Sequence, residues 1–307
     1  MIRKILGVLI VGLYLLTTVS LCAAVENVPV GETSWFGSWF AQQTATGNWG
    51  GLRQNLVNKG VSLTANYTTD ILGNPVGGLK QAVRYAGFLQ VMAALDFEKM
   101  ASFQGWALTM SNYVASGSNL SSEIGNFYGV QEIYSPGSYY FGVLDFSFSL
   151  PGDVLTLEAG RLFAGDVFAT SSLWQYYVSS INSNIVSISS NIFFPHFQVA
   201  AWGARASYNS PDNKWQFISG IYDANPNVGD PDKYGLDFSF DDSYGCLAVS
   251  QLTYKHHQGR QETGLAGSAA FGGYYDSNKF AGVVESDRFW HGNYGFYFIV
   301  DQMIYRG

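Results

Sequence analysis

Ten segments of this sequence alternate apolar and polar residues with a period of two, the pattern of a β-strand that has one face in an apolar environment. In the first segment, Val61, Leu63, Ala65 and Tyr67 alternate with polar residues. A chain that repeats this pattern so often folds predominantly as antiparallel β-structure. The ten predicted strands lie within residues 61–68, 89–98, 106–114, 140–150, 155–163, 198–208, 215–223, 246–255, 263–275 and 294–305.

The length of these segments favours a membrane barrel over a soluble sheet. Most have about 9 to 12 residues, enough for a tilted strand to cross a bilayer core, whereas globular strands usually have roughly 5 to 6. Only 13% of residues are charged, about half the share in ordinary soluble domains. Because lipid offers no partners to backbone groups, membrane strands must close into a barrel. We therefore predict an all-β fold, a transmembrane antiparallel β-barrel; a soluble β-sandwich or secreted lectin is the alternative. Aromatic residues mark the ends of several segments, as expected at a membrane interface: Trp106, Tyr140, Trp215, Tyr254, Tyr275 and Tyr294.

The N-terminus has the pattern of an export signal. An apolar run from Ile5 to Leu16 follows two basic residues and ends near the small residues Cys22 and Ala24. We predict a cleaved signal peptide at residues 1–24, a periplasmic segment at 25–60 and the barrel domain at 61–307; a retained N-terminal anchor is the alternative. After cleavage, Cys246 is the one cysteine left, which excludes an internal disulfide.

The connections between the predicted strands are of two kinds. Those at residues 149–153 and 209–213 are short and rich in Pro, Gly, Asn and Asp, as in tight periplasmic turns, whereas longer ones fit external loops. Helical spacing of Leu52, Leu56 and Val57 before Gly60 predicts a short helix within residues 51–59. The connection at 166–190 is longer than usual and predicts a partly helical loop that folds into the barrel.

A series of glycine-rich and aromatic motifs runs through the chain in a fixed order. It begins with TGNWGGLR at 46–53 and continues with DILGN at 70–74, GGL at 77–79, EAGR at 158–161 and FAT at 168–170. It ends with AWG at 201–203, YD at 222–223, GNYG at 292–295 and VDQM at 300–303. The order and spacing resemble the carbohydrate-selective porins of Gram-negative outer membranes, the OprB type, over about residues 47–306. Asn48 stands where that family commonly has Asp.

This resemblance implies a sixteen-stranded barrel that passes sugars. Since ten segments are visible, and the sequence lacks the terminal aromatic residue usual in such barrels, we expect the barrel domain to be incomplete at its C-terminal end. A smaller barrel, or strands without a clear alternation, is the alternative.

A sugar-conducting pore requires polar and aromatic side chains in its lumen. Sugar hydroxyls form hydrogen bonds with charged and amide groups, and sugar C–H faces pack on Trp and Tyr. Charges on strands are expected to face the lumen, because a lipid-facing charge costs roughly 2 to 4 kcal/mol. Glu158 and Arg161 are three residues apart and cannot both face inward on a regular strand; we keep Arg161, which the resemblance covers. The predicted pore-lining or substrate-binding residues are Asp70, Arg84, Asp96, Glu98, Arg161, Asp166, Trp174, Tyr176 and Arg205, and Glu158 and Tyr177 are further candidates.

These features predict passive diffusion of carbohydrates and other small hydrophilic solutes through a Gram-negative outer membrane, with no enzymatic step. A general or anion-leaning porin is the first alternative, favoured if Arg84, Arg161 and Arg205 cluster without facing carboxylates. A barrel phospholipase and a plugged adhesin barrel are the others. The four histidines have no metal-ligand spacing, and no cofactor is expected. An acidic loop at 222–232 lacks the glycine of a full calcium loop and fits a plain turn-rich loop better.

The expected partners follow from this class of protein. They are sugars and small hydrophilic solutes in the pore, outer-membrane lipid around the barrel, and the barrel assembly machinery during biogenesis. Removal of the signal peptide takes away Arg3 and Lys4 and lowers the net charge from −7 to about −9, which argues against nucleic acid as a partner. The chain is expected to be a monomer or a homotrimer.

Overall fold

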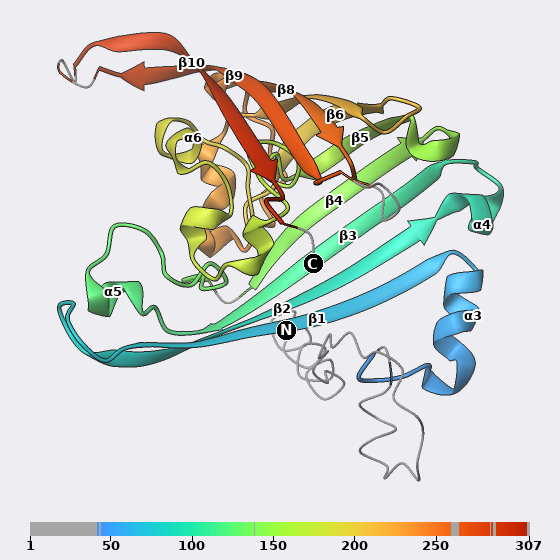
Figure 1. The fold of residues 1–307 in the computed structure, drawn as a ribbon, viewed down its shortest axis with the longest axis horizontal. Helices are drawn as coiled ribbons and strands as arrows, with labels where there is room; N and C mark the ends of the chain where they lie inside the picture. Colours follow the sequence, from blue (N-terminus) through green and yellow to red (C-terminus); the bar gives the residue numbers. More distant parts are fainter. Residues whose placement is uncertain are drawn as a thin grey trace.

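Ten antiparallel strands form one curved sheet in the computed structural model, which describes residues 42, 44–137, 139–258, 264–282, 284 and 287–305 (Figure 1). Each strand pairs with the next along the chain, so that β1 and β10 lie at the two edges of the sheet. The strands are β1 (Val61–Asn74), β2 (Ala82–Asp96), β3 (Trp106–Gly117), β4 (Tyr139–Ser149), β5 (Leu155–Leu162), β6 (Ala201–Asn209), β7 (Trp215–Asp223), β8 (Cys246–His256), β9 (Gly267–Ala281) and β10 (Phe289–Gln302).

All ten predicted strands are confirmed, although two hairpins are longer than the alternation indicated. β2 begins at Ala82 and pairs with β1 up to Asn74, and β9 extends to Ala281 opposite Phe289 of β10. The added residues are stabilised by backbone hydrogen bonds between the two strands of each hairpin. They therefore form strands without a regular alternation of apolar and polar residues. The predicted start of the ninth strand at Thr263 lies outside the described residues.

The connections alternate between the two ends of the sheet. Short turns and the small helix α4 (Phe97–Ala101) lie at one end, whereas the long connections with α5 (Ser121–Ile124) and α6 (Val186–Asn191) lie at the other (Figure 1). The two predicted tight turns are confirmed, the first of them as the single turn η2 (Pro151–Asp153). The other single-turn 3₁₀ helices are η1 (Trp49–Gly51), η3 (Trp174–Tyr176), η4 (Ser180–Asn182), η5 (Pro226–Gly229), η6 (Pro231–Lys233) and η7 (Asp242–Tyr244).

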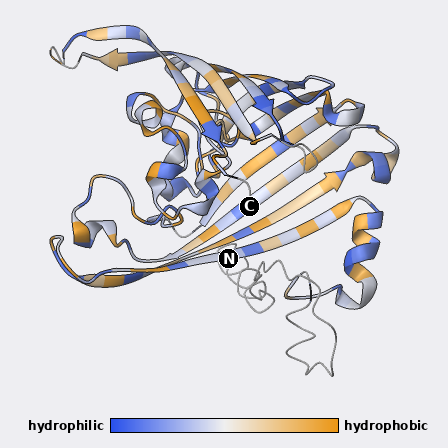
Figure 2. Cartoon of the chain, in the orientation of Figure 1, coloured by the Kyte–Doolittle hydropathy of each residue, from blue (hydrophilic) through white to orange (hydrophobic). Residues whose placement is uncertain are grey.

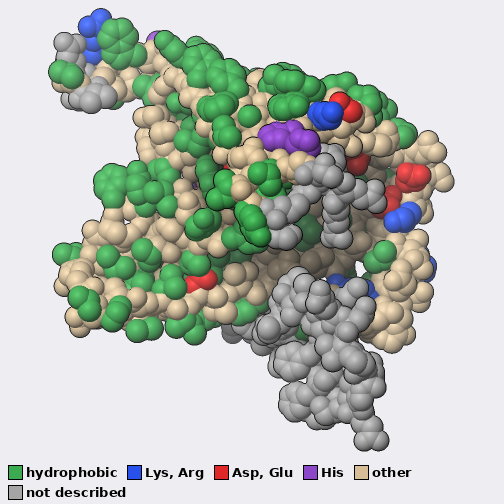
Figure 3. Space-filling model, in the orientation of Figure 1, with side chains coloured by type: hydrophobic (Ala, Val, Ile, Leu, Met, Phe, Trp, Pro, Cys, Tyr) green, Lys and Arg blue, Asp and Glu red, His purple; other side chains and the backbone are tan. Residues whose placement is uncertain are grey.

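The sheet has an apolar convex face and a concave face that packs against the chain's own loops. On β10, Tyr294, Phe296 and Phe298 are 72%, 73% and 64% exposed, whereas Tyr297 between them is 7% exposed. The same alternation runs along the other strands (Figure 2), and hydrophobic side chains cover the outer surface of β9 and β10 (Figure 3). Large apolar side chains open to the surroundings on one face only are those expected of strands that contact lipid.

The connection between β5 and β6, residues 163–200, folds onto the concave face, and we call it the inward loop. Phe168 and Ile188 of this loop are buried against Tyr222, Leu247 and Tyr297 of the sheet. Figure 1 shows α6 and the rest of the inward loop on the inner side of the curved sheet. The predicted partly helical loop inside the barrel is therefore confirmed.

The short N-terminal helix is also confirmed, as α3 (Leu52–Asn58) just before β1. Gly60 lies between this helix and β1 and has a φ of +86°. Only glycine fits here, because a Cβ at this position would lie 2.5 Å from the carbonyl oxygen of Asp96. Among the described residues, none of the helices is both long enough and apolar enough to span a bilayer. The predicted signal peptide lies outside the described residues.

Candidate functional site in the concave face

Two adjoining cavities lie on the concave side of the sheet, beside the inward loop. The larger, about 300 Å³, is lined by the inward loop and by Glu132 of the connection between β3 and β4. The smaller, about 240 Å³, is lined by β1, β2 and the same connection. Glu132 and Phe197 line both cavities, so the two lie next to each other on the inside of the sheet.

The inward loop is held on the sheet by hydrogen bonds from the strands. Gln251 of β8 accepts from the Ala169 amide at 3.2 Å and from the Tyr297 hydroxyl at 2.8 Å. Within the loop, the Asn184 amide group donates to the carbonyls of Gly165 and Phe168 at 2.9 and 3.2 Å. Because Asn184 is 5% exposed, few waters can replace these bonds, and the loop has a fixed position in the lumen.

The larger cavity combines carboxylates with an aromatic ring. Asp166 of the inward loop and Glu132 from the opposite connection both line it, and the half-buried Trp174 on η3 adds its indole. Burial raises the pKa of the Glu132 carboxyl above its usual range, and a hydrogen bond from Ser183 acts in the opposite direction. Asp166 and Trp174 were predicted as site residues, and the structure brings them together.

Asn66, Thr68 and Gln90 line the smaller cavity, and Asp70 follows on the same face of β1, so Asp70 lies on the concave side of the sheet. Tyr176, in contrast, is 78% exposed and does not line either cavity.

Arg205 is paired within the sheet. Its guanidinium donates from Nε and Nη2 to the two Glu158 carboxylate oxygens, both at 2.6 Å, and from Nη1 to the Phe163 carbonyl at 3.0 Å. Glu158 and Arg205 face each other across β5 and β6, and their side chains are 14% and 10% exposed. Both side chains face the concave side of the sheet.

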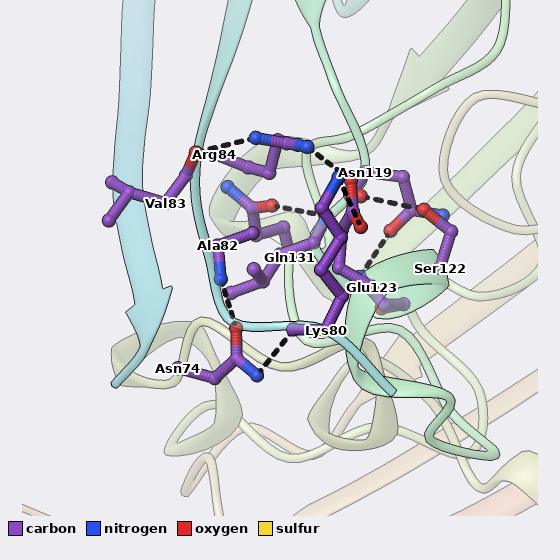
Figure 4. A network of polar contacts seen from close by, with 11 residues as sticks. Asn74, Lys80, Ala82, Val83, Arg84, Asn119, Ser122, Glu123 and Gln131 are labelled. Carbon is purple, nitrogen blue, oxygen red and sulfur yellow. Dashed lines mark hydrogen bonds and ion pairs between the residues drawn. The ribbon is translucent and has the colours of Figure 1, made fainter. Parts of the chain in front are cut away.

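Arg84 reaches the rim of the concave face, where it joins a polar network (Figure 4). It donates to Glu123 of α5, which also lies 3.7 Å from Lys80 of the β1–β2 loop. The hydrogen bond from Arg84 and the charges of both basic residues lower the pKa of the Glu123 carboxyl. The Asn74 side chain closes the β1–β2 loop through bonds to Gly77, Lys80 and Ala82.

Arg161 does not line the lumen, which corrects the prediction. It lies three residues after Glu158 on β5 and therefore faces the opposite, convex side. Arg161 is nevertheless 1% exposed, because the connection between β7 and β8 covers it, and its guanidinium donates to the carbonyls of Gly235 and Ala200. The charge is thus placed on the outer face but is removed from contact with lipid.

Asp96 and Glu98 do not line either cavity. Asp96 ends β2 as the N-cap of α4, where it accepts from the backbone amides of Glu98 and Lys99 at 3.1 and 3.3 Å. Glu98 is exposed on that helix. Because a capping carboxylate is bound to its own turn, both residues belong to the short-turn end of the sheet.

Several residues of the site were not predicted. Glu132 lies in an irregular connection, and Gln251 and Tyr297 contact the inward loop from strands far along the chain. The alternation along β8 and β10 places Gln251 and Tyr297 on the concave face. No sequence pattern near either residue indicates that it contacts the Ala169 amide of the inward loop.

A wall of antiparallel strands with an apolar outer face, an inner face of polar groups and a loop folded inward is the architecture of a porin-type β-barrel. A model of the family described as carbohydrate-selective porin, OprB family, matches residues 80–307. The chain belongs to this family, whose members are outer-membrane proteins.

Two known proteins are similar to the chain. Porin B of Pseudomonas aeruginosa is 25% identical over 257 residues, which cover 76% of this chain and 52% of Porin B. A high-pH structure of Pseudomonas putida OprB matches with a TM-score of 0.73 and 22% identity, covering 85% of this chain and 66% of that one. The chain therefore spans about half the length of Porin B and about two thirds of the OprB chain.

Proposed function

We propose that the protein conducts carbohydrates passively through the outer membrane, along the path beside the inward loop. The observation that carries this proposal is the larger cavity, where Asp166 and Glu132 stand beside the indole of Trp174. Carboxylates accept hydrogen bonds from sugar hydroxyls, and an indole packs against sugar C–H groups. Family membership and the similarity to Porin B support the same substrate class.

The distribution of charge disfavours an anion-leaning pore. Arg84 and Arg205 are each bonded to a glutamate, and Arg161 faces outward, so the three arginines do not form an unpaired basic cluster. The carboxylates of Glu132 and Asp166 line the larger cavity instead. Small cations and neutral sugars fit this lining better than anions do.

The direct test is sugar-dependent block of the ion current through the intact protein in planar bilayers. Trp174→Ala removes the stacking surface, worth roughly 0.5 to 1.5 kcal/mol, and is expected to weaken oligosaccharide block about 3- to 10-fold. Tyr176→Ala is the matched control, since this exposed aromatic on the same 3₁₀ turn does not line the cavities. Ion conduction without any sugar-dependent block would contradict the proposal and favour a general diffusion pore.

The orientation and the state of the protein in the membrane belong to the same proposal. The short-turn end, with α4, faces the periplasm and the long connections face outward. Residues 1–24 direct export and are removed, so the purified protein is expected to begin at Val25. The barrel works in outer-membrane lipid as a monomer or homotrimer, after insertion by the assembly machinery, and transport involves no catalytic step. Lipid hydrolysis by the purified protein, lost in His291→Ala, would contradict the last point.

A further inference from the structure

The wall of the sheet has a gap at the long-loop end between β4 and β5. β4 begins at Tyr139, but its ladder with β5 begins only at the pair Leu144–Arg161 and runs toward the short-turn end. Immediately after Leu162 the chain leaves the sheet and enters the inward loop, where Phe163 is buried on the concave side. The edge of β4 from Tyr139 to Val143 therefore has no partner on β5.

A distant segment occupies this edge. We call residues 224–245, the connection between β7 and β8, the outer loop. The Phe141 amide of β4 donates to the Tyr234 carbonyl of the outer loop at 2.8 Å, in place of a bond to β5. The next residue, Gly235, approaches so closely that a Cβ there would lie 2.2 Å from the Phe141 carbonyl oxygen, and its φ is +67°. The outer loop thus docks backbone to backbone on the free edge of β4, which only glycine permits at this position.

Side chains on the convex face of the sheet contact the outer loop and hold it in place. The guanidinium of Arg161 lies 5.1 Å from the ring centroid of Phe238, and the Trp202 indole donates to the Phe238 carbonyl at 3.1 Å. The Phe238 ring also contacts Phe141, at 5.5 Å between centroids. The outer loop reaches from the end of β7 past β6 and β5 to β4, and these contacts fix it along that course.

Arg161 joins the outer loop to the inward loop. It donates to the Gly235 carbonyl in the outer loop and, at 3.0 Å, to the carbonyl of Ala200, the last residue of the inward loop before β6. Both acceptors are backbone groups, and a planar guanidinium can serve the two at once. Arg161 lies between the two loops and is 1% exposed, so water does not compete for its hydrogen bonds. Hydrogen bonds from a charged donor are stronger than those between neutral groups.

We propose that the outer loop is a seal over a lateral opening in the barrel wall, and that Arg161 is the positioning residue that fastens this seal to the base of the inward loop. Without the seal, the gap between β4 and β5 connects the lumen with the surrounding lipid at the level of the inward loop. The seal also explains why a charge on the convex face is tolerated there. This inference depends on the barrel architecture and is independent of which solute passes.

Trypsin tests the fastening, because Lys233 lies in the outer loop next to the docked Tyr234. The intact protein in proteoliposomes is expected to resist cleavage after Lys233. Arg161→Met keeps the length of the side chain but removes both donors, and is expected to speed cleavage about tenfold or more, since each bond to a charged donor contributes strongly. Arg161→Lys restores part of the resistance. Arg288→Met is the control: it removes an arginine that lies over Trp290 in the β9–β10 hairpin, far from the outer loop along the chain.

Single-channel recording separates positioning of the two loops from mere stability of the barrel. A seal fastened to the inward loop predicts open-channel current that fluctuates more in Arg161→Met than in the control, at a temperature where thermal unfolding curves show both variants to be fully folded. Gly235→Ala is a second way to displace the outer loop from β4, and it alters no strand residue. It tests the seal even if Arg161→Met does not assemble. Rapid cleavage of the unaltered protein would overturn the proposal. So would resistance and quiet current in Gly235→Ala, or equal effects of Arg288→Met.

Discussion

Glu158 and Arg205 form a bidentate ion pair across β5 and β6, with both nitrogen-to-oxygen distances at 2.6 Å and both side chains on the concave face. A third guanidinium bond, to the Phe163 carbonyl, ties this pair to the first residue of the inward loop. The pair therefore neutralises two charges of the lumen and fixes the point where the loop leaves the sheet. Neither charge is free to filter ions while the partner is present.

Separating this pair is expected to change both ion preference and stability. Arg205→Met leaves Glu158 as an unpaired carboxylate in the lumen and makes the pore more selective for cations, whereas Glu158→Gln shifts selectivity toward anions. Loss of one partner of such a buried pair costs about 3 kcal/mol. Reversal potentials in a salt gradient and urea unfolding measure the two effects. Arg53→Met, in α3 outside the sheet, is the control, and equal selectivity shifts in it and in Arg205→Met would rule the explanation out.

The double variant sharpens this prediction. Glu158→Gln combined with Arg205→Met removes both charges and leaves no unpaired ion, so it is expected to be more stable than Arg205→Met alone. Additive losses from the two substitutions would show that the two side chains do not interact in the membrane.

The anchor of the inward loop gives a prediction for conductance. Asn184→Leu removes the amide donors of the carbonyls of Gly165 and Phe168 and leaves these buried acceptors without that partner, at a cost of about 1 to 3 kcal/mol. The loop then leaves its fixed position, and single-channel conductance and current noise rise. Ser190→Leu, at an exposed position of the same loop that lines neither cavity, is a suitable comparison, and identical traces from both variants would contradict the role of Asn184.

The alternation of the sequence predicted the strands because each strand needs only local information. Residues two apart share a face wherever the chain is extended, so the apolar side of β1 or β7 is visible without knowing its neighbours. The same rule assigned Glu158 and Arg161 to opposite faces. It could not say which faced inward, because the outer loop that covers Arg161 comes more than sixty residues later in the chain.

The path itself was less accessible to sequence analysis. Asp166 and Trp174 were predicted because the long connection that contains them was expected to fold into the lumen, which brings its side chains to the inner surface. Glu132 was not, since an acidic residue in an irregular connection has no pattern that fixes its direction. Asp96 shows another limit: the alternation extended the predicted strand to residue 98, whereas β2 ends at Asp96, whose side chain caps the helix Phe97–Ala101.

The link between Arg84 and Glu123 predicts a pH dependence of the rim. Because the bond to Arg84 lowers the pKa of Glu123 below its usual 4.5, the ion pair stabilises the folded rim above that pH. This contribution is lost as the pH falls through the lowered pKa. Hydrogen exchange of the Leu79 and Lys80 amides, which bond to carbonyls of Ile124 and Glu123, is expected to show weaker protection at pH 3 than at pH 6, after correction for intrinsic rates. Glu123→Gln should show the weak protection at both values.

The assignment of the two faces is tested by a charge on neighbouring positions of β2. Leu89 lies on the convex face, and Gln90 lines the smaller cavity on the concave face. As neighbours on one strand they lie at nearly the same depth, but Leu89 faces lipid and Gln90 faces the lumen. Leu89→Arg places a guanidinium in lipid at a cost of roughly 2 to 4 kcal/mol near mid-membrane, whereas Gln90→Arg places it in water, where the cost is small. Refolding into lipid vesicles followed by urea titration measures the difference. Leu89→Arg is expected to unfold at lower urea, while Gln90→Arg keeps its stability and lowers cation selectivity. The reverse order would place lipid on the concave side and exclude a water-filled path beside the inward loop.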